Sequence, residues 1–157
     1  MARRPRPGKV RLLLVVLVLL AVGGVVYALT GLTDRQLLPV IEAMRDCGVP
    51  VSVDTFKPEV MRAVLDAGAD MINDIYGFRQ PGAIEAVAQS RCGLCVMHMK
   101  GEPRTMQTAP EYTDLIGEIG VFLGSRAQRL RAAWVDPRRI VLDPGFGFGK
   151  TQAQNYE

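Results

Sequence analysis

Polar side chains recur at the ends of four short apolar runs in the sequence. They are Asp54, Asn73 with Asp74, His98 and Asp143. If these runs are parallel strands of one sheet, their carboxyl ends meet at the edge where α/β folds bind ligands. A carboxylate can accept two parallel N–H bonds, and an amide can both donate and accept. The set predicts a site for a flat heterocycle, although an aspartate after a strand is also a common helix N-cap.

A glycine-rich segment, LDPGFGFGKT at residues 142–151, contains the last of these carboxylates. It ends like a nucleotide phosphate loop, which has Gly, four residues and Gly-Lys-Ser/Thr after a strand. Pro144 occupies the position of the first glycine, and proline has no N–H to offer a phosphate. The glycines also lack the G-x-G-x-x-G spacing of dinucleotide sites. We therefore expect a flexible loop whose backbone approaches a different kind of ligand.

Cys92 and Cys95 form a C-x-x-C pair, with His98 three residues further on. A zinc site would need a fourth ligand, and Cys47 lies far upstream. A redox pair would open a helix after a strand, whereas LCVMH at 94–98 has the composition of a strand. The favoured interpretation is two small side chains buried at the entry of a strand.

Strands and helices alternate along the rest of the chain and must position these residues. Strands are expected at 49–54, 70–74, 94–98 and 139–143, and helices at 36–48, 58–68, 81–90 and 110–134. The last helix carries an apolar set near one face, made of Leu115, Ile119, Phe122, Leu130 and Trp134. Such alternation predicts an α/β fold with parallel strands and right-handed crossovers.

The N-terminal segment, residues 1–33, differs from the remainder. Five of the 19 Lys and Arg residues lie within the first 11, and residues 12–29 are uncharged and mostly apolar. This pattern predicts a transmembrane-like helix that anchors the chain, with a cleaved signal peptide or a non-native leader as alternatives. From residue 12 onward the charges nearly balance, so no nucleic-acid partner is expected.

Four segments, SVDTFKPEV, INDI, VMHMKGEPRTMQ and LDPGFGFGK, resemble the dihydropteroate synthase family in order and spacing. The resemblance covers residues 34–157. It implies a domain from a TIM-type (β/α)8 barrel, with about four β/α units that correspond to strands three to six. It also implies the family reaction, in which p-aminobenzoate is joined to 6-hydroxymethyl-7,8-dihydropterin diphosphate with assistance from Mg²⁺.

The resemblance also assigns roles to individual residues. It implies that Asp54, Asn73 and Asp143 hydrogen-bond the edge of the pterin. Ile75 and Met97 would form apolar walls of the pterin slot. Phe148 would border p-aminobenzoate. Gly147 and Lys150 would belong to the mobile loop, and no residue is assigned as a metal ligand.

The sequence also departs from the family pattern. The N-x-T-P-D-S-F and S-T-R-P-G loops are absent, as are the S-R-K and R-x-H strand ends that bind the diphosphate. We therefore expect little or no activity from this chain alone, and a second copy or another chain to complete the barrel. The alternatives are a membrane-anchored, non-catalytic pterin-binding module and a methyltetrahydrofolate-binding methyltransferase domain. The family implies a cytoplasmic location, whereas a native leader would imply membrane association.

Overall fold

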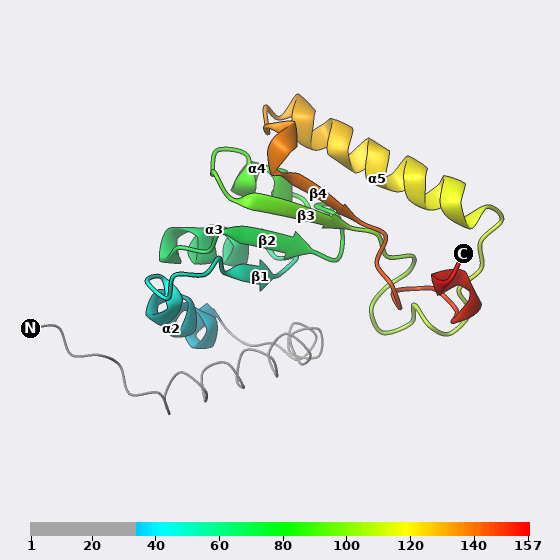
Figure 1. The fold of residues 1–157 in the computed structure, drawn as a ribbon, viewed down its shortest axis with the longest axis horizontal. Helices are drawn as coiled ribbons and strands as arrows, with labels where there is room; N and C mark the ends of the chain where they lie inside the picture. Colours follow the sequence, from blue (N-terminus) through cyan, green and yellow to red (C-terminus); the bar gives the residue numbers. More distant parts are fainter. Residues whose placement is uncertain (1–33) are drawn as a thin grey trace, which may run out of the picture. The chain divides into compact units, whose positions relative to one another are not determined.

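The computed structural model describes residues 34–157, which form one compact unit (Figure 1). The basic tail and the apolar anchor predicted within residues 1–33 lie outside the described residues. Among the helices of residues 34–157, none combines the length and the hydropathy needed to cross a bilayer. The described elements are, in order, α2 (Asp34–Met44), β1 (Ser52–Asp54), α3 (Pro58–Ala67), β2 (Met71–Asp74), α4 (Ala83–Val87), β3 (Gly93–Met97), α5 (Leu115–Ala132), η1 (Pro137–Arg139), β4 (Ile140–Asp143) and η2 (Ala153–Asn155).

The four strands form one parallel sheet in the order β1-β2-β3-β4. In Figure 1 all four arrowheads point the same way, so the loops that follow the strands gather at one edge of the sheet. Each strand is joined to the next through a helix, because parallel neighbours require a crossover connection. The α/β fold with parallel strands is therefore confirmed.

The two faces of the sheet differ because successive side chains of a strand point to opposite sides. On one face, Ile72, Leu94 and Val96 are completely buried. Helices α3 and α4 lie behind the sheet in Figure 1 and cover this face. Burying each such side chain stabilises the fold by about 1.5–3 kcal/mol. The opposite face carries half-buried residues, among them Asn73 and Cys95.

Strand β1 is shorter than predicted. It begins at Ser52 rather than at residue 49. Pro50 has no backbone N–H to donate to a neighbouring strand. Val49 before it is 63% exposed. Helix α3 begins at Pro58 as predicted, and Gly68 closes it with a left-handed φ of 106°.

Trp134 does not lie on the buried face of α5, so that prediction is wrong. The helix ends at Ala132, and Trp134 follows it with a left-handed φ of 65°. Its N–H donates to the carbonyl oxygen of Arg131 at 3.0 Å. At this position beyond the helix the side chain turns outward, and Trp134 is 92% exposed.

Candidate functional site

Three of the predicted residues, Asp54, Asn73 and Asp143, lie on the face of the sheet opposite to α3 and α4, which we call the uncovered face. Asp54 and Asn73 are paired across β1 and β2. Asn73 Nδ2 donates to Asp54 Oδ2 at 3.0 Å. Asp143 ends β4 and is paired with Met97 of β3. The period of two along each strand places Asp54, Asn73, Met97 and Asp143 on the same side.

The amide of Asn73 is only half satisfied. Its Nδ2 has the Asp54 carboxylate, whereas its Oδ1 is buried without a hydrogen-bond partner within the described part of the chain. A buried polar atom without a partner costs about 1–3 kcal/mol. Such an atom marks a place where a ligand donor would bind favourably.

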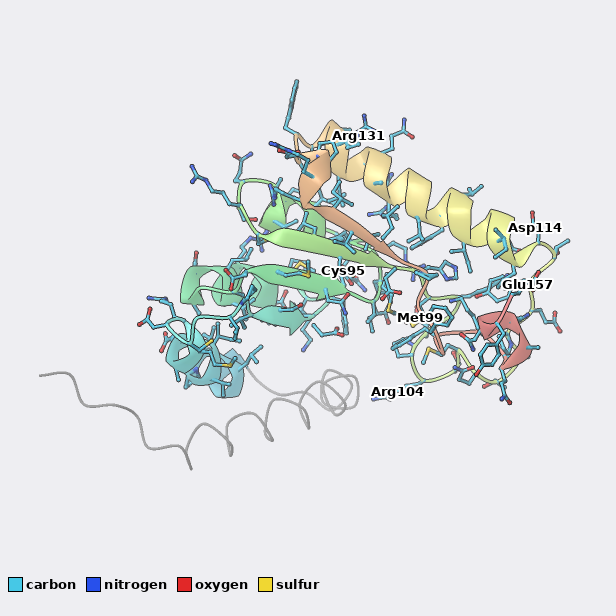
Figure 2. The ribbon with its side chains drawn as sticks, in the orientation of Figure 1. Cys95, Met99, Arg104, Asp114, Arg131 and Glu157 are labelled. Carbon is cyan, nitrogen blue, oxygen red and sulfur yellow. The ribbon has the colours of Figure 1, made fainter. Side chains whose placement is uncertain are left out.

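Cys95 lies between these groups, and the sequence analysis did not assign it to the site. It is paired with Asn73 on one side and Val141 on the other, and Figure 2 labels it on the sheet. Burial raises the pKa of its thiol to about 11, and the charges of Asp143 and Asp54 add to the shift. The thiol therefore stays protonated at neutral pH and offers a weak donor rather than a nucleophile. The signal in the sequence was its position two residues before Met97.

Burial also raises the pKa of Asp54, while the hydrogen bond from Asn73 opposes the shift. Two carboxylates, an amide and a neutral thiol thus share one face of the four strands, and we call them the polar row. Asp54, Asn73 and Cys95 are level in register, and Asp143 lies two residues further along its strand, level with Met97. These groups suit a neutral ring with several N–H donors, because its hydrogen bonds would offset the cost of burying the carboxylates.

Asp74 and His98 do not join this row, although both stand at strand ends. Asp74 is completely buried and accepts hydrogen bonds from the backbone N–H groups of Tyr76 and Phe78, both at 2.8 Å. Burial raises its pKa to about 6. The ring of His98 packs edge-on against Phe122 of α5 at a centroid distance of 5.1 Å. Both residues lie one position along from a residue of the uncovered face, so the pleat directs them to the opposite side.

An apolar cluster lies beside the polar row and joins the loops that follow all four strands. Its buried members come from the end of β3 and from the loops that follow β2 and β3, and Figure 2 labels Met99 among them. The cluster comprises Ile75, Tyr76, Met97 and Met99, with Phe56, Met106 and Phe148 packed against it. Ile75 and Met97, predicted as apolar walls of the pterin slot, are thus brought together with Phe148, predicted to border p-aminobenzoate, and their roles toward a ligand stay predictions. The rings of Phe56 and Tyr76 lie 4.8 Å apart and were not predicted.

The glycine-rich loop after β4 packs tightly on the end of β3. Asp143 Oδ1 accepts from the N–H of Gly145 at 2.7 Å. Gly145 has a φ of 70°, and a Cβ there would lie 2.1 Å from the His98 carbonyl oxygen. The N–H of Gly147 donates to Asn155 Oδ1 at 2.7 Å, and its carbonyl accepts from Gln107. The loop is therefore held on both sides.

Lys150 points into the molecule and is 5% exposed. Its ammonium donates to the carbonyl oxygens of Gly145 and Phe148, at 2.9 and 3.1 Å. A phosphate-loop lysine must instead reach a bound phosphate. The inward direction of Lys150 gives a second reason, after Pro144, to reject a nucleotide site.

The C-x-x-C pair is not a disulfide. Cys92 is buried near Ser90 Oγ, 3.0 Å away, and both cysteines are free. Within residues 34–157 no group of three or more His, Cys, Asp and Glu side chains could hold a metal ion. Burial of Cys92 at the strand entry agrees with the favoured interpretation, whereas Cys95 faces the polar row.

The model of the family described as "Pterin binding enzyme" matches residues 33–157, which is most of the chain. The chain belongs to this pterin-binding family. The dihydropteroate synthase of Escherichia coli (strain K12) is 43% identical over 123 residues, which cover 78% of this chain and 44% of that protein. The dihydropteroate synthase of Synechocystis is also 43% identical, with 77% and 43% covered.

Solved structures of this pterin-binding family agree with the fold. Dihydropteroate synthase of Burkholderia cenocepacia complexed with 7,8-dihydropteroate is 58% identical, with a TM-score of 0.69 and coverage of 74% of this chain and 42% of that one. The Xanthomonas albilineans synthase with 4-aminobenzoic acid is 49% identical, with a TM-score of 0.70 and coverage of 78% and 43%. The chain thus spans less than half the length of the relatives it matches.

Proposed function

We propose that residues 34–157 form about four β/α units of a TIM-type barrel and bind the ring of a pterin at the carboxyl ends of the strands. The observation that carries this proposal is the Oδ1 atom of Asn73, which is buried without a partner among residues 34–157 and lies on the same face of the sheet as Asp54 and Asp143. The fused ring of a pterin has amino and ring N–H donors next to ring acceptors. Such a ring complements two carboxylates and an amide.

The reaction we propose for the protein is that of its relatives. An arylamine, p-aminobenzoate, would attack the CH₂ group of a pterin diphosphate and release diphosphate. The apolar cluster with Phe148 would border the arylamine, and the polar row would hold the pterin. A cytoplasmic location accompanies this role in folate synthesis.

Mg²⁺, which the resemblance implies, does not fit the side chains of residues 34–157. They offer no group of three or more His, Cys, Asp and Glu side chains that could hold it. Mg²⁺ prefers several oxygen ligands around an octahedron. No step of the proposed reaction is therefore assigned to a metal held by these residues.

Titration calorimetry with a dihydropterin tests the ring-binding proposal. Asp54→Asn and Asp143→Asn each exchange a charged acceptor for a neutral amide of the same shape. We expect each to weaken binding by about tenfold to a hundredfold, because a hydrogen bond to a charged group contributes about 1.5–3 kcal/mol. Asp66→Asn is the matched control, because Asp66 is exposed on α3, away from the polar row. Equal affinities for all four proteins, or no binding by the unaltered chain, would refute the proposal.

A further inference from the structure

Lys150 is a buried cation without a carboxylate at ion-pairing distance among the described residues. The ion pairs of residues 34–157 involve Lys100 with Glu118 and Arg138 with Asp136. The ammonium of Lys150 instead has three neutral acceptors, namely two loop carbonyls and the Nδ1 atom of His98 at 3.2 Å. Burying a charge in this way is costly unless each donor is satisfied. The three hydrogen bonds satisfy the ammonium and join the loop carbonyls to His98.

His98 is arranged to accept this hydrogen bond. The ammonium has donors only, so Nδ1 must be the unprotonated nitrogen of the ring. The ring is wedged against Phe122 and is 5% exposed. Burial lowers the pKa of His98 to about 4, and the charge of Lys150 adds to the shift, so the ring is neutral at pH 7. His98 therefore presents a fixed acceptor at the back of the glycine-rich loop.

The same contacts set the path of the loop. Gly145 O accepts both from Lys150 Nζ, at 2.9 Å, and from the N–H of Phe148, at 3.1 Å. A Cβ on Gly149 would lie 2.5 Å from the carbonyl oxygen of Lys100, so the backbone lies directly on the segment after β3. Phe148 stands between these anchored points and packs on the apolar cluster.

We propose that Lys150 and His98 form an internal clamp that positions Phe148 in the candidate site. The lysine ammonium joins the carbonyls of Gly145 and Phe148 to the imidazole of His98. The clamp holds the aromatic ring at the side of the site proposed for the arylamine. Lys150 is thus a positioning residue and makes no contact with the ligand. This assignment rests on the proposed function for the identity of the ligand, but not for the clamp itself.

The chain contains a single histidine, so the imidazole ¹⁵N spectrum of the uniformly labelled full chain reports on His98 alone. At pH 7 we expect an unprotonated δ1 nitrogen and a protonated ε2 nitrogen. In Lys150→Met the fixed tautomer should be lost. Hydrogen exchange of the Gly145, Gly147 and Phe148 amides should become about tenfold faster or more, because a bond from a charged donor is removed.

Lys100→Met is the matched control. Lys100 also lies near His98, but its ammonium is bonded to Glu118 at 2.7 Å rather than to the ring. Its loss removes a nearby positive charge and should change neither the tautomer nor the exchange of the loop amides. Similar effects from both lysine variants would overturn the clamp, as would a protonated δ1 nitrogen in the unaltered chain.

Two His98 variants keep the test decisive if Lys150→Met does not fold. In His98→Asn the Oδ1 atom can replace the Nδ1 acceptor, so loop exchange should stay slow. In His98→Leu no acceptor remains, and exchange should accelerate as in Lys150→Met. Equal exchange in these two variants would contradict the proposal. A failure of the unaltered chain to bind a dihydropterin would refute the proposed function alone, because the tautomer and the exchange rates are measured without ligand.

Discussion

At the scale of single residues, the pleat separates side chains that line the candidate site from side chains that build the loops. Asn73 and Asp74 are neighbours in β2, yet Asn73 faces the polar row and Asp74 is buried on the other side. The carboxylate of Asp74 accepts the N–H groups of Tyr76 and Phe78 and thereby fixes the loop after β2. Chemical type alone does not distinguish two such residues, whereas their position in the strand does.

The first prediction concerns His98 and the pH dependence of stability. The pKa of His98 in the folded chain, about 4, lies below the ordinary value of 6.5. As the pH falls, His98 is therefore protonated in the unfolded chain before it is protonated in the folded chain. The contribution of neutral His98 to the free energy of unfolding is complete above pH 6.5. About 3 kcal/mol of it is lost as the pH falls to 4. Asp74, with its pKa raised to about 6, acts in the opposite sense over nearly the same range.

The variant His98→Asn removes the titration of His98 and leaves that of Asp74. We therefore expect the free energy of unfolding of the variant to rise as the pH falls from 6.5 to 4, relative to that of the unaltered chain. Urea unfolding followed by circular dichroism at several pH values measures it. Parallel curves for the two proteins would show that His98 is not held neutral in the folded state.

At the scale of elements, the loop between β2 and α4 is fixed from two sides. Asp74 accepts its N–H groups, and Arg126 of α5 donates to its carbonyls. The guanidinium Nε atom lies 2.7 Å from Gly77 O, and a second nitrogen contacts Phe78 O. Arg126 is buried, so its hydrogen bonds connect helix α5 to this loop away from solvent.

Removal of this guanidinium should destabilise the fold. In Arg126→Met the carbonyls of Gly77 and Phe78 remain buried without their donor, at a cost of about 1–3 kcal/mol for each. We expect the free energy of unfolding to fall by about 2–4 kcal/mol. Arg129→Met is the control, because Arg129 is exposed on the same helix. A loss no larger than that of the control would contradict the two-sided attachment.

The end of α5 provides the opposite case, in which a substitution should stabilise the protein. Trp134 has a left-handed φ of 65° and is 92% exposed. A residue with a Cβ pays roughly 1 kcal/mol or more for this conformation, and glycine does not. We expect Trp134→Gly to raise the unfolding free energy by about 1 kcal/mol in thermal melts. Trp134→Ala retains the Cβ and should give no such gain, so equal melts for both variants would contradict the interpretation.

At the scale of the whole molecule, the described residues offer the acceptors proposed to recognise a pterin ring but little positive charge for a departing diphosphate. Departure of that group develops negative charge, which cations and oriented donors must stabilise. Lys150, the basic residue of the glycine-rich loop, is buried and bonded to three internal acceptors. The S-R-K and R-x-H clusters of the family pattern have no counterpart in the sequence.

We therefore expect the 157-residue chain alone to form no dihydropteroate above background. Loss of one good electrostatic contact costs roughly a hundredfold or more in rate, and several are missing. The assay combines the pterin diphosphate, p-aminobenzoate and Mg²⁺ with purified chain free of host synthase. Turnover that disappears in Asp143→Ala would refute this prediction, since it would place a complete site on the chain.

Much of this arrangement followed from the sequence. The four strands, the shared edge and the positions of Asp54, Asn73 and Asp143 were predictable, because local pattern fixes strand ends and parallel pairing brings them together. The inward direction of Lys150 was not, because it depends on a contact with His98, 52 residues away. Trp134 was misplaced for a different reason. The helix ended two residues earlier than its apolar spacing suggested.

Trp134 also has a practical consequence for anyone who studies this protein in solution. It is the single tryptophan of the chain, and its indole is already almost fully in contact with water in the folded state. Its fluorescence emission should therefore resemble that of the unfolded chain and respond little to denaturant. Emission from the native indole would be a poor reporter of folding. The fluorescence emission of a tryptophan introduced in place of Phe148 should be quenched or shifted by a ligand that enters the candidate site.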